Sequence, residues 1–396
     1  MTARRHPGKS FFRGVEPVSG NQLRLLQGGA EFFPALIAAI DAARDEIHLE
    51  TYIFNADPSA GAVRDALIGA ARRGVQVRVL IDGVGSRELP AAWQAALEAT
   101  GASVLVYRPL VNNWRSDPHS LRRLHRKLAV IDARVAFLGG MNIIDDFEPV
   151  RLASPRLDFS VEVRGPLLVP IHRSVRHLWR LVALTQLQGH GRNTAIEPSW
   201  PTDGHVRAAF VVRDNFAHRR DIERVYLAAL ALARDEIVIA NAYFLPGRRF
   251  RKLLKNAAAR GVPVHLLVQG HTDHPFFQSA ARALYRDLLA AGVNIYEYQA
   301  SELHAKVAVV DGHWATVGSS NIDPFSLLLA REANIVVDDA GFARDLRQRL
   351  QQAIGQSVAL DPADWQRRPW PQRMMSWLAY GGVRLMVGLA GAGRLT

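Results

Sequence analysis

Short apolar runs along this chain alternate with longer segments in which apolar residues recur at helical spacing. Three runs follow one another in the first half, IHLETYIF (47–54), VQVRVLID (75–82) and SVLVY (103–107), and a helical segment precedes each of them. Helices that lead repeatedly into buried strands at this spacing are typical of α/β architecture. We therefore predict an α/β protein in which apolar strands form a sheet and helices cover it.

The second half of the chain repeats the order of the first. The pentapeptide ARDEI occurs at 43–47 and again at 233–237, each time at the end of a helical segment and before a strand. Two halves of similar order indicate a duplication, with a boundary in the Pro- and Gly-containing stretch near 188–205. We divide the chain into a basic N-terminal segment (1–22), a first domain (23–190), a second domain (205–358) and a C-terminal segment (359–396).

One pair of segments carries the strongest chemical signal. HRKLAVIDARVAFLGGMN (125–142) and HAKVAVVDGHWATVGSSN (304–321) share the form H-x-K-x4-D-x6-G-[GS]-x-N. Only five of the 396 residues are lysine, and two of these five stand at the matching place of the two copies. A single His-x-Lys on a strand is usually a surface pair, but two complete and matching copies favour a catalytic or binding function.

The spacing within each copy predicts a hairpin. Residues two apart share one face of a strand, so His125 and Lys127 point the same way, and the same holds in the second copy. Asp132 begins a turn, and an apolar strand resumes after it. Folding the hairpin there places Asn142 opposite His125, and the glycines before Asn142 allow a ligand to approach the backbone closely.

The second copy predicts the same arrangement with His304, Lys306, Asp311 and Asn321. Each half then presents an imidazole, an ammonium group and a carboxamide, which suit an anionic tetrahedral group: lysine and asparagine bind its oxygens while histidine does the chemistry. We count both aspartates with the catalytic motif, but as turn residues we expect them to anchor the hairpin rather than contact substrate.

One half alone is chemically incomplete. Displacement at phosphorus through a covalent intermediate requires a nucleophile on one side and a proton donor for the leaving oxygen on the other. Two copies that meet across a pseudo-twofold axis supply both from equivalent histidines. A nucleophilic imidazole also needs a carboxylate that fixes its tautomer. We assign this role to Glu332 in the second half and Asp158 in the first, 28 and 33 residues after the histidine of the same half.

Composition limits the classes of function. The 49 Lys+Arg against 37 Asp+Glu give a net charge of +12, which suits nucleic acid, an anionic membrane surface or an acidic substrate. The absence of cysteine excludes disulfide scaffolds, thiolate nucleophiles and Cys-ligated zinc or iron–sulfur centres. The basic N-terminus lacks the apolar core of a secretory signal, and no apolar run is long enough to predict a membrane-spanning helix.

The paired motifs resemble the HKD signatures of the phospholipase D superfamily, and the resemblance covers roughly residues 23–355. Within this superfamily, the segments NAYFLPGRRF, HWATVGSSNIDPFSL and REANIVV are similar to bacterial cardiolipin synthases, most of all those of the B type. The resemblance implies two tandem phospholipase D-like α/β domains, each a mixed β-sheet flanked by helices. They are related by pseudo-twofold symmetry and share one active site.

The resemblance also implies a reaction. A cardiolipin synthase transfers a phosphatidyl group from one phosphatidylglycerol to another in two steps, through a phosphatidyl-histidine, with no metal or other cofactor. By analogy we take His125 as the nucleophile and His304 as the general acid and base. The paired lysines and asparagines hold the phosphoryl oxygens. Ser319 stands where the first copy has Gly140, so a hydroxyl contact to the phosphate is available on one side only.

Three other functions remain open at this point. Water can resolve the same intermediate, so a phospholipase D that hydrolyses lipids would use the same residues. An HKD nuclease would suit the arginine excess, although nothing in the sequence resembles a base-stacking platform or a groove-reading helix, and we expect no nucleic-acid partner. A catalytically inactive basic binding module would not need both motifs to be complete, and both are.

Two segments bear on a lipid substrate. LVNNWRSDPHSLRRL (110–124) occurs only in the first half and is either a lip over the active site, with Trp114, Arg115, Arg122 and Arg123, or an ordinary surface insertion. The tail from Trp365 to Thr396 has no acidic residue and combines arginine, tryptophan and methionine. That combination favours contact with an anionic bilayer over a helix folded on its own domain, and its glycines suggest that the segment becomes ordered only on lipid.

We therefore expect a peripheral protein on the cytoplasmic face of the cell membrane. The oligomeric state is left open.

Overall fold

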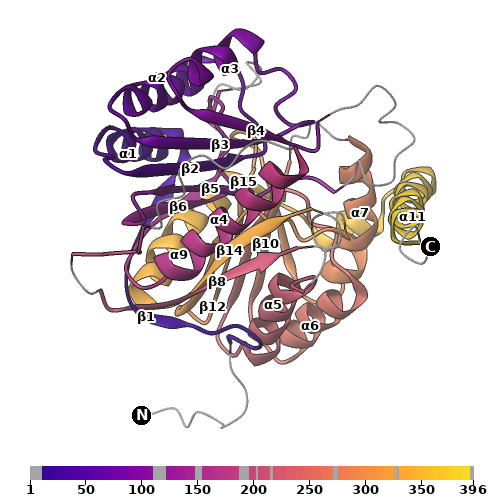
Figure 1. Ribbon diagram of the computed structural model, residues 1–396. Helices are drawn as coiled ribbons and strands as arrows, with labels where there is room; N and C mark the ends of the chain where they lie inside the picture. The colour runs from indigo at the N-terminus through magenta and orange to yellow at the C-terminus, as the bar shows by residue number, and fades with distance from the viewer. Residues whose placement is uncertain are drawn as a thin grey trace.

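A single fifteen-stranded sheet runs through the computed structural model, which describes residues 11–109, 122–147, 154–186, 196–201, 204–214, 217–270, 275–324, 326 and 330–392 (Figure 1). The strands of the first half are β1 (Val18–Gln27), β2 (Glu46–Thr51), β3 (Gln76–Asp82), β4 (Ser103–Tyr107), β5 (Lys127–Ile131), β6 (Val135–Gly139) and β7 (Phe159–Arg164). Those of the second half are β8 (Val206–Arg213), β9 (Ile237–Asn241), β10 (Val264–Gln269), β11 (Asn294–Tyr298), β12 (Lys306–Val310), β13 (Trp314–Gly318), β14 (Glu332–Asp338) and β15 (Ser357–Ala359).

The strand order shows the duplication directly. One half reads β4-β3-β2-β5-β6-β7-β1 and the other reads β11-β10-β9-β12-β13-β14-β8, with β15 added at the edge beside β11. The strands β2, β3 and β4 of the first half are parallel to one another, as are β9, β10 and β11 of the second half. The other strands pair antiparallel, so both half-sheets are mixed, as predicted. The halves join through an antiparallel pairing of β1 with β8. Because β1 begins at Val18, it starts inside the segment 1–22 that we separated from the first domain.

Helices cover both faces of the sheet. They are α1 (Gly28–Asp41), α2 (Pro58–Arg72), α3 (Ala91–Glu98), α4 (Leu168–Thr185), α5 (Asp221–Leu232), α6 (Arg248–Ala259), α7 (Pro275–Leu289), α9 (Ala340–Gly355), α10 (Pro362–Gln366) and α11 (Trp370–Ala392). The first three helices pack on the outer face of one half-sheet and α5, α6 and α7 on that of the other (Figure 1). The sequence at the N-terminus of α2 explains why the helix begins there. Asp57 caps the helix by accepting from the Ala60 N–H at 2.8 Å, and Pro58 is the first helical residue.

The two halves share a hydrophobic core. Apolar residues of β5, β6 and β7 pack with those of β12, β13 and β14, and the N-terminal half of α4 and the whole of α9 close this core from the side. Val130 and Val309, at equivalent places in the two motif hairpins, are both fully or almost fully buried in it. Neither half therefore completes its core without the other.

The motif aspartates tie each hairpin to the ARDEI segment of the same half. Asp132 accepts hydrogen bonds from the backbone N–H groups of residues 44–46 at 2.8–3.0 Å. Asp311 does the same with residues 234–236 at 2.8–3.1 Å. Both aspartates have a positive φ, near 50°, a backbone region that few residues other than glycine adopt. In each half, therefore, the repeated motif and the repeated ARDEI segment contact each other, and the aspartate of the motif binds the backbone of ARDEI.

The C-terminal segment is ordered as helix. Of its two helices, α11 packs along α7, with Ala379 and Val383 buried between them. Gly382 lies against this contact: a Cβ there would approach the Phe276 ring to 3.1 Å, so the glycine that we expected to weaken the helix allows α7 and α11 to pack closely. The tail is therefore a helix packed on its own domain, the arrangement that its composition favoured less. Within the described residues, we find no helix with the length and hydropathy needed to cross a membrane.

Replacing Asp311 with alanine tests the anchoring contact. Asp311→Ala removes the charged acceptor of three backbone hydrogen bonds, so we expect the free energy of unfolding to fall by about 1–3 kcal/mol, measured by urea denaturation. The matched control is Asp235→Ala, since the exposed Asp235 side chain belongs to the same turn. Unchanged stability together with lost activity of Asp311→Ala would instead place this carboxylate in the chemistry.

Candidate active site

The two motif histidines lie where segments of the two halves cross. His125 precedes β5, and its backbone N–H donates to the Arg331 carbonyl at 3.0 Å. His304 precedes β12, and its N–H donates to the Leu157 carbonyl at 2.9 Å. Each crossing is a short parallel bridge between the residues before a histidine of one half and the residues before a carboxylate of the other. Backbone hydrogen bonds thus hold the two motifs in register across the pseudo-twofold axis.

Each histidine is paired with a carboxylate from the opposite half. Nδ1 of His125 lies 2.9 and 3.1 Å from the two carboxylate oxygens of Glu332, and Nδ1 of His304 lies 2.5 Å from Oδ2 of Asp158. The sequence identified both carboxylates, but our pairing of each with the histidine of its own half was wrong. The reason is the crossing: each carboxylate directly follows a bridge formed with the other half, so it faces the other motif. Glu332 is the first residue of β14, and Asp158 immediately precedes β7.

This pairing fixes the chemistry of the imidazoles. A carboxylate at Nδ1 holds the proton there, which leaves the Nε2 lone pair available for attack or proton transfer. The His125 and His304 side chains retain 18% and 15% exposure, whereas both carboxylates are buried. Burial raises the pKa of Asp158 and lowers the pKa of both histidines, so it favours the neutral imidazole before substrate binds.

The two motif lysines lie beside the histidines. Nζ of Lys127 donates to the His125 carbonyl at 2.6 Å, and Nζ of Lys306 donates to the His304 carbonyl. Burial lowers the pKa of Lys127 to about 7 and that of Lys306 to about 8. Both ammonium groups, together with His125, also lower the pKa of His304, so the four motif groups act on one electrostatic site. An anionic phosphate bound there would restore the positive charge of both lysines.

Ser319 and Gly140 differ from our prediction. Ser319 is fully buried, and its hydroxyl donates to Oε2 of Glu332 at 2.5 Å, so it supports the carboxylate that orients His125 and is not free to bind phosphate. In the first half a Cβ at position 140 would collide with the Asp158 carboxylate. The shorter aspartate therefore fills the space beside a glycine, whereas the longer glutamate is held by a serine.

The two motif asparagines are buried but have different surroundings. Oδ1 of Asn142 accepts from the Ile53 N–H at 3.1 Å, just after β2. Oδ1 of Asn321 is buried and has no hydrogen-bond partner among the described residues. In the second half the corresponding strand-end contact is made by Asn241, which accepts from the Ile322 N–H at 3.0 Å.

Sequence reasoning missed Tyr52. Its ring centroid lies 5.0 Å from that of His125, and Nζ of Lys127 lies 5.4 Å from the Tyr52 ring centroid. Alignment of the two ARDEI repeats places Ala242 at the corresponding position of the second half. The difference between tyrosine and alanine at this position could have pointed to Tyr52. We searched the two halves for matching residues, however, and such a search discards the positions at which they differ.

The extra stretch of the first half is only partly described. Trp114 and Arg115 lie outside the described residues. Arg123 forms an ion pair with the buried carboxylate of Asp82, with Nη2 and Oδ1 2.9 Å apart. This contact makes Arg123 part of the protein interior and not a group that reaches for lipid headgroups.

One cluster away from the motifs has the composition of a metal site. Glu46, His48 and His172 are buried together between β2 and α4. Nη1 of Arg78 lies 3.0 Å from a Glu46 carboxylate oxygen and 3.2 Å from Nε2 of His48, so a guanidinium already occupies the position between these two ligands. We interpret the cluster as a buried ion pair that holds α4 on the sheet.

The sequence matches the family model described as "Cardiolipin synthase, PLD-like domain" at residues 36–146 and 226–354. It is 38% identical over 383 residues to cardiolipin synthase B of Escherichia coli K12, covering 94% of this chain and 90% of that protein. It is 39% identical over 387 residues to cardiolipin synthase B of Salmonella typhimurium, with the same coverage. Cardiolipin synthase A of Pectobacterium atrosepticum is 32% identical over 374 residues, which cover 93% of this chain and 76% of that protein.

Two solved structures share the fold. Phosphatidylserine synthase of Haemophilus influenzae superposes with a TM-score of 0.67 at 13% identity, covering 96% of this chain and 97% of that one. Polyphosphate kinase of Porphyromonas gingivalis gives a TM-score of 0.57 at 14% identity over 92% of this chain and 53% of that one. At such low identity these likenesses support the fold alone. Together with the matched family model and the bacterial relatives, the paired motifs show that the chain belongs to the cardiolipin synthase family of phospholipase D-like proteins.

Proposed function

We propose that this protein makes cardiolipin by phosphatidyl transfer between two phosphatidylglycerol molecules. The observation that carries the proposal is the reciprocal pairing of His125 with Glu332 and of His304 with Asp158. It prepares two imidazoles in one site for proton transfer or nucleophilic attack, as a two-step displacement at phosphorus requires. Family membership directs the proposal to a phospholipid.

In the first step, Nε2 of His125 attacks the phosphorus of one phosphatidylglycerol. The bond from phosphorus to the glycerol oxygen breaks, and His304 gives a proton to that oxygen, so that glycerol leaves. The proton is taken up when the anionic phosphate binds, because its negative charge and that of Asp158 favour the cationic form of the imidazole. The negative charge that develops on the phosphoryl oxygens is balanced by Lys127 and Lys306. Glu332 stabilises the positive charge that the phosphorylated imidazole of His125 carries.

In the second step, the hydroxyl of another phosphatidylglycerol loses its proton to His304 and attacks the same phosphorus. The phosphorus–nitrogen bond breaks, His125 returns to its neutral state, and cardiolipin leaves. Water could take the place of this alcohol and give phosphatidic acid, so exclusion of water decides between transfer and hydrolysis.

The same proposal places the protein at a membrane as a peripheral protein on the cytoplasmic face, with phosphatidylglycerol and the anionic surface as its partners. It is supported by the proposed lipid substrates and by the basic, Trp- and Met-containing α11, which exposes large apolar side chains. The reaction as proposed uses no metal or other cofactor.

Lipid analysis tests the reaction. Purified protein incubated with phosphatidylglycerol in mixed micelles should yield cardiolipin and glycerol, detected by mass spectrometry. His125→Ala and His304→Ala each remove one imidazole, and we expect both to lose activity by about a thousandfold or more. Phosphatidic acid without cardiolipin would make the protein a hydrolase. No lipid product at all would require an assay of nucleic-acid cleavage and would overturn the proposal.

Trapping the intermediate tests the separate roles of the histidines. With a phosphodiester whose leaving group needs no proton, such as a nitrophenyl ester, the first step bypasses the general acid. We therefore expect His304→Ala to accumulate a phosphorylated His125, seen as an added mass on the peptide that contains this residue. His125→Ala should show no adduct. An adduct on His304 in the His125→Ala variant would reverse the assignment.

The lysines predict an alkaline limit of activity. Because burial lowers their pKa to about 7 and about 8, the free enzyme loses positive charge as pH rises through that range. We therefore expect kcat/KM in uncharged detergent micelles to fall as pH rises from 7 to 9, whereas ordinary lysines would stay charged to about pH 10. The fall in kcat should come at higher pH, since bound phosphate favours the charged lysines. A flat kcat/KM profile over this range would contradict the prediction.

A further inference from the structure

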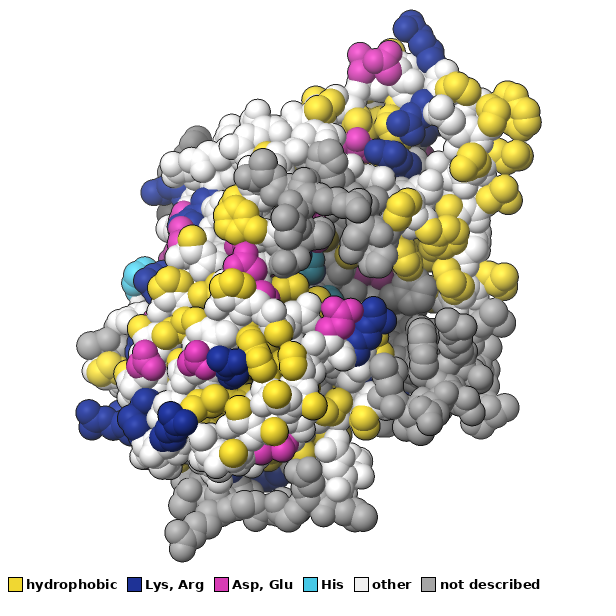
Figure 2. Space-filling view, turned by 90° about the horizontal axis from the view of Figure 1, so that it is seen from above, with side chains coloured by type: hydrophobic (Ala, Val, Ile, Leu, Met, Phe, Trp, Pro, Cys, Tyr) yellow, Lys and Arg dark blue, Asp and Glu magenta, His cyan; other side chains and the backbone are white. Residues whose placement is uncertain are grey.

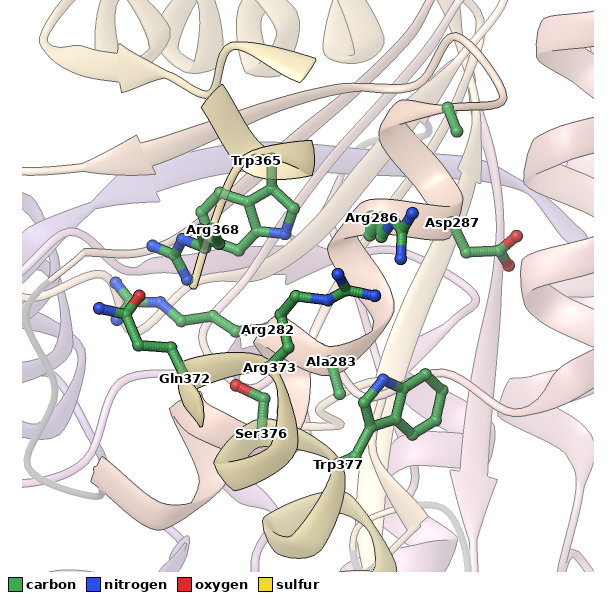
Figure 3. Close-up of a pocket in the computed structure, with 11 residues that line it drawn as sticks. Arg282, Ala283, Arg286, Asp287, Trp365, Arg368, Gln372, Arg373, Ser376 and Trp377 are labelled. Carbon is green, nitrogen blue, oxygen red and sulfur yellow. The ribbon is translucent and has the colours of Figure 1, made fainter. Parts of the chain in front are cut away.

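A cleft with four arginines lies outside the catalytic motifs, and no motif residue lines it. It has a volume of about 310 Å³ and is bounded by α7, α10 and the first turns of α11 (Figure 3). Its walls contain the guanidinium groups of Arg282, Arg286, Arg368 and Arg373, the indoles of Trp365 and Trp377, and the polar side chains of Gln372 and Ser376.

Acidic groups near the cleft do not neutralise it. Asp287, which also lines it, is paired with Lys255, with Nζ 3.0 Å from both carboxylate oxygens. Glu297 lies behind the cleft and is paired with Arg282 at 2.9 Å. The guanidinium groups of Arg286 and Arg373 form no hydrogen bond or ion pair with any described residue. The cleft therefore offers positive charge to a ligand from outside.

Arg368 is already held in place by an aromatic ring. The guanidinium carbon of Arg368 lies 3.4 Å from the centroid of the Trp365 ring, and Trp365 is 7% exposed. Stacking on a buried indole orders the guanidinium before any ligand binds, which reduces the entropy lost on binding. Burial lowers the pKa of Arg368, and the neighbouring Arg282, which is held by Glu297, lowers it further. A site that concentrates like charges in this way suits a compact anion such as a phosphate group, which guanidinium forks bind in bidentate fashion.

The outer face of α11 beside the cleft is apolar. One stripe of α11, with Ala379 and Val383, packs on α7. The opposite face exposes large apolar side chains with 41–70% exposure: Trp370, Met374, Met375, Trp377, Leu378, Leu385 and Met386. Figure 2 shows hydrophobic side chains gathered with basic ones along the edge of the molecule where α11 lies. The segment 365–396 contains five arginines and no acidic residue, so its charge complements an anionic surface.

We propose that the cleft between α7, α10 and α11 binds the phosphate of an anionic phospholipid headgroup while the apolar face of α11 lies in the acyl boundary of the same membrane. Trp377 lines the cleft and is also part of the exposed apolar face, so headgroup and acyl chains meet at one place on the protein. Tryptophan and arginine beside an apolar stripe are the residues that settle at a bilayer interface. The site is separate from the catalytic histidines and acts as a second, non-reacting contact with the membrane.

Vesicle binding tests the proposal with a matched pair of variants. Full-length protein is sedimented with vesicles of phosphatidylcholine alone or of phosphatidylcholine mixed with phosphatidylserine, an anionic lipid outside the proposed reaction. We expect R286A/R373A to bind the mixed vesicles about tenfold more weakly or worse, since each arginine near an anionic surface contributes measurably. The control R248A/R249A removes two exposed arginines at the start of α6 and should bind as the unaltered protein does. Thermal melting verifies that both variants are folded.

The apolar face requires its own variant. Replacing Leu378 and Leu385 with serine should weaken binding to both kinds of vesicle, whereas R286A/R373A should lose binding only to the anionic ones. Equal losses in R286A/R373A and R248A/R249A would reduce the effect to overall charge and overturn the headgroup site. Unchanged binding of R286A/R373A would also overturn it.

Two further measurements exclude other occupants. Saturable binding of soluble glycerol phosphate that depends on Arg286 and Arg373, without any change in vesicle binding, would make the ligand a free phosphate compound. Light scattering of the protein in solution tests a second copy of the chain. A dimer that the serine variant dissociates, with vesicle binding unchanged, would assign the apolar face to dimerisation and overturn the membrane proposal.

Discussion

The exchange of carboxylates between the two halves is the constraint on which the rest of the structure depends. Glu332 orients His125 and Asp158 orients His304, so each half contains an imidazole that only the other half can orient. An imidazole without its carboxylate loses both its fixed tautomer and the stabilisation of its cationic form. The duplicated chain therefore has one site that neither half can form alone.

The fold meets this constraint at several levels. The β1–β8 pairing makes one sheet of two, and the core between β5–β7 and β12–β14 buries apolar surface from both halves. At the site itself, the N–H groups of His125 and His304 bind carbonyls of the opposite half. Sheet, core and backbone bridges all fix the same relation between the halves, so the distance from each imidazole to its carboxylate is set by backbone as well as by side chains. Such preorganisation lets charge develop in a reaction without movement of the surrounding groups.

The sequence revealed the parts of the site that the duplication copies. The α/β class followed from repeated patterns, and the family resemblance from the paired motifs with two lysines in a lysine-poor chain. The mixed half-sheets were implied by that resemblance. Patterns within one half could not show contacts between halves, and for that reason the carboxylates were found but paired wrongly. Ser319 was misread for another reason: its partner Glu332 begins the next strand of the same half, and the spacing within the motif does not show this contact between neighbouring strands.

The C-terminal segment illustrates a different limit. Composition indicated an anionic surface, but glycine counted by helix propensity alone suggested a disordered tail. Helix propensity is a weak guide to structure where tertiary packing stabilises the helix. Gly382 lies at the close contact with the Phe276 ring of α7, so here the glycine favours packing. The four arginines of the cleft come from segments about 80 residues apart in sequence, so only the fold brings them together.

The differences between the two halves bear more directly on the division of catalytic roles than the features that the halves share. Two identical histidine sites would have no reason to divide the roles of nucleophile and acid between them. Here the His125 side has Tyr52 against its imidazole and a glutamate held by Ser319, whereas the His304 side has Ala242 in place of the tyrosine and an aspartate beside Gly140. The Tyr52 ring contacts the imidazole of His125, at a position where the other half has only the methyl group of Ala242. A phosphorylated histidine must be protected from water until the acceptor alcohol arrives, and an acid–base histidine must exchange protons with incoming hydroxyl groups. The His125 and His304 side chains are almost equally exposed, at 18% and 15%, so overall access to water does not separate these two roles. The difference lies in the contacts: Tyr52 and the serine-held Glu332 restrict the orientation of the His125 imidazole, as attack in line with the leaving oxygen requires of a nucleophile.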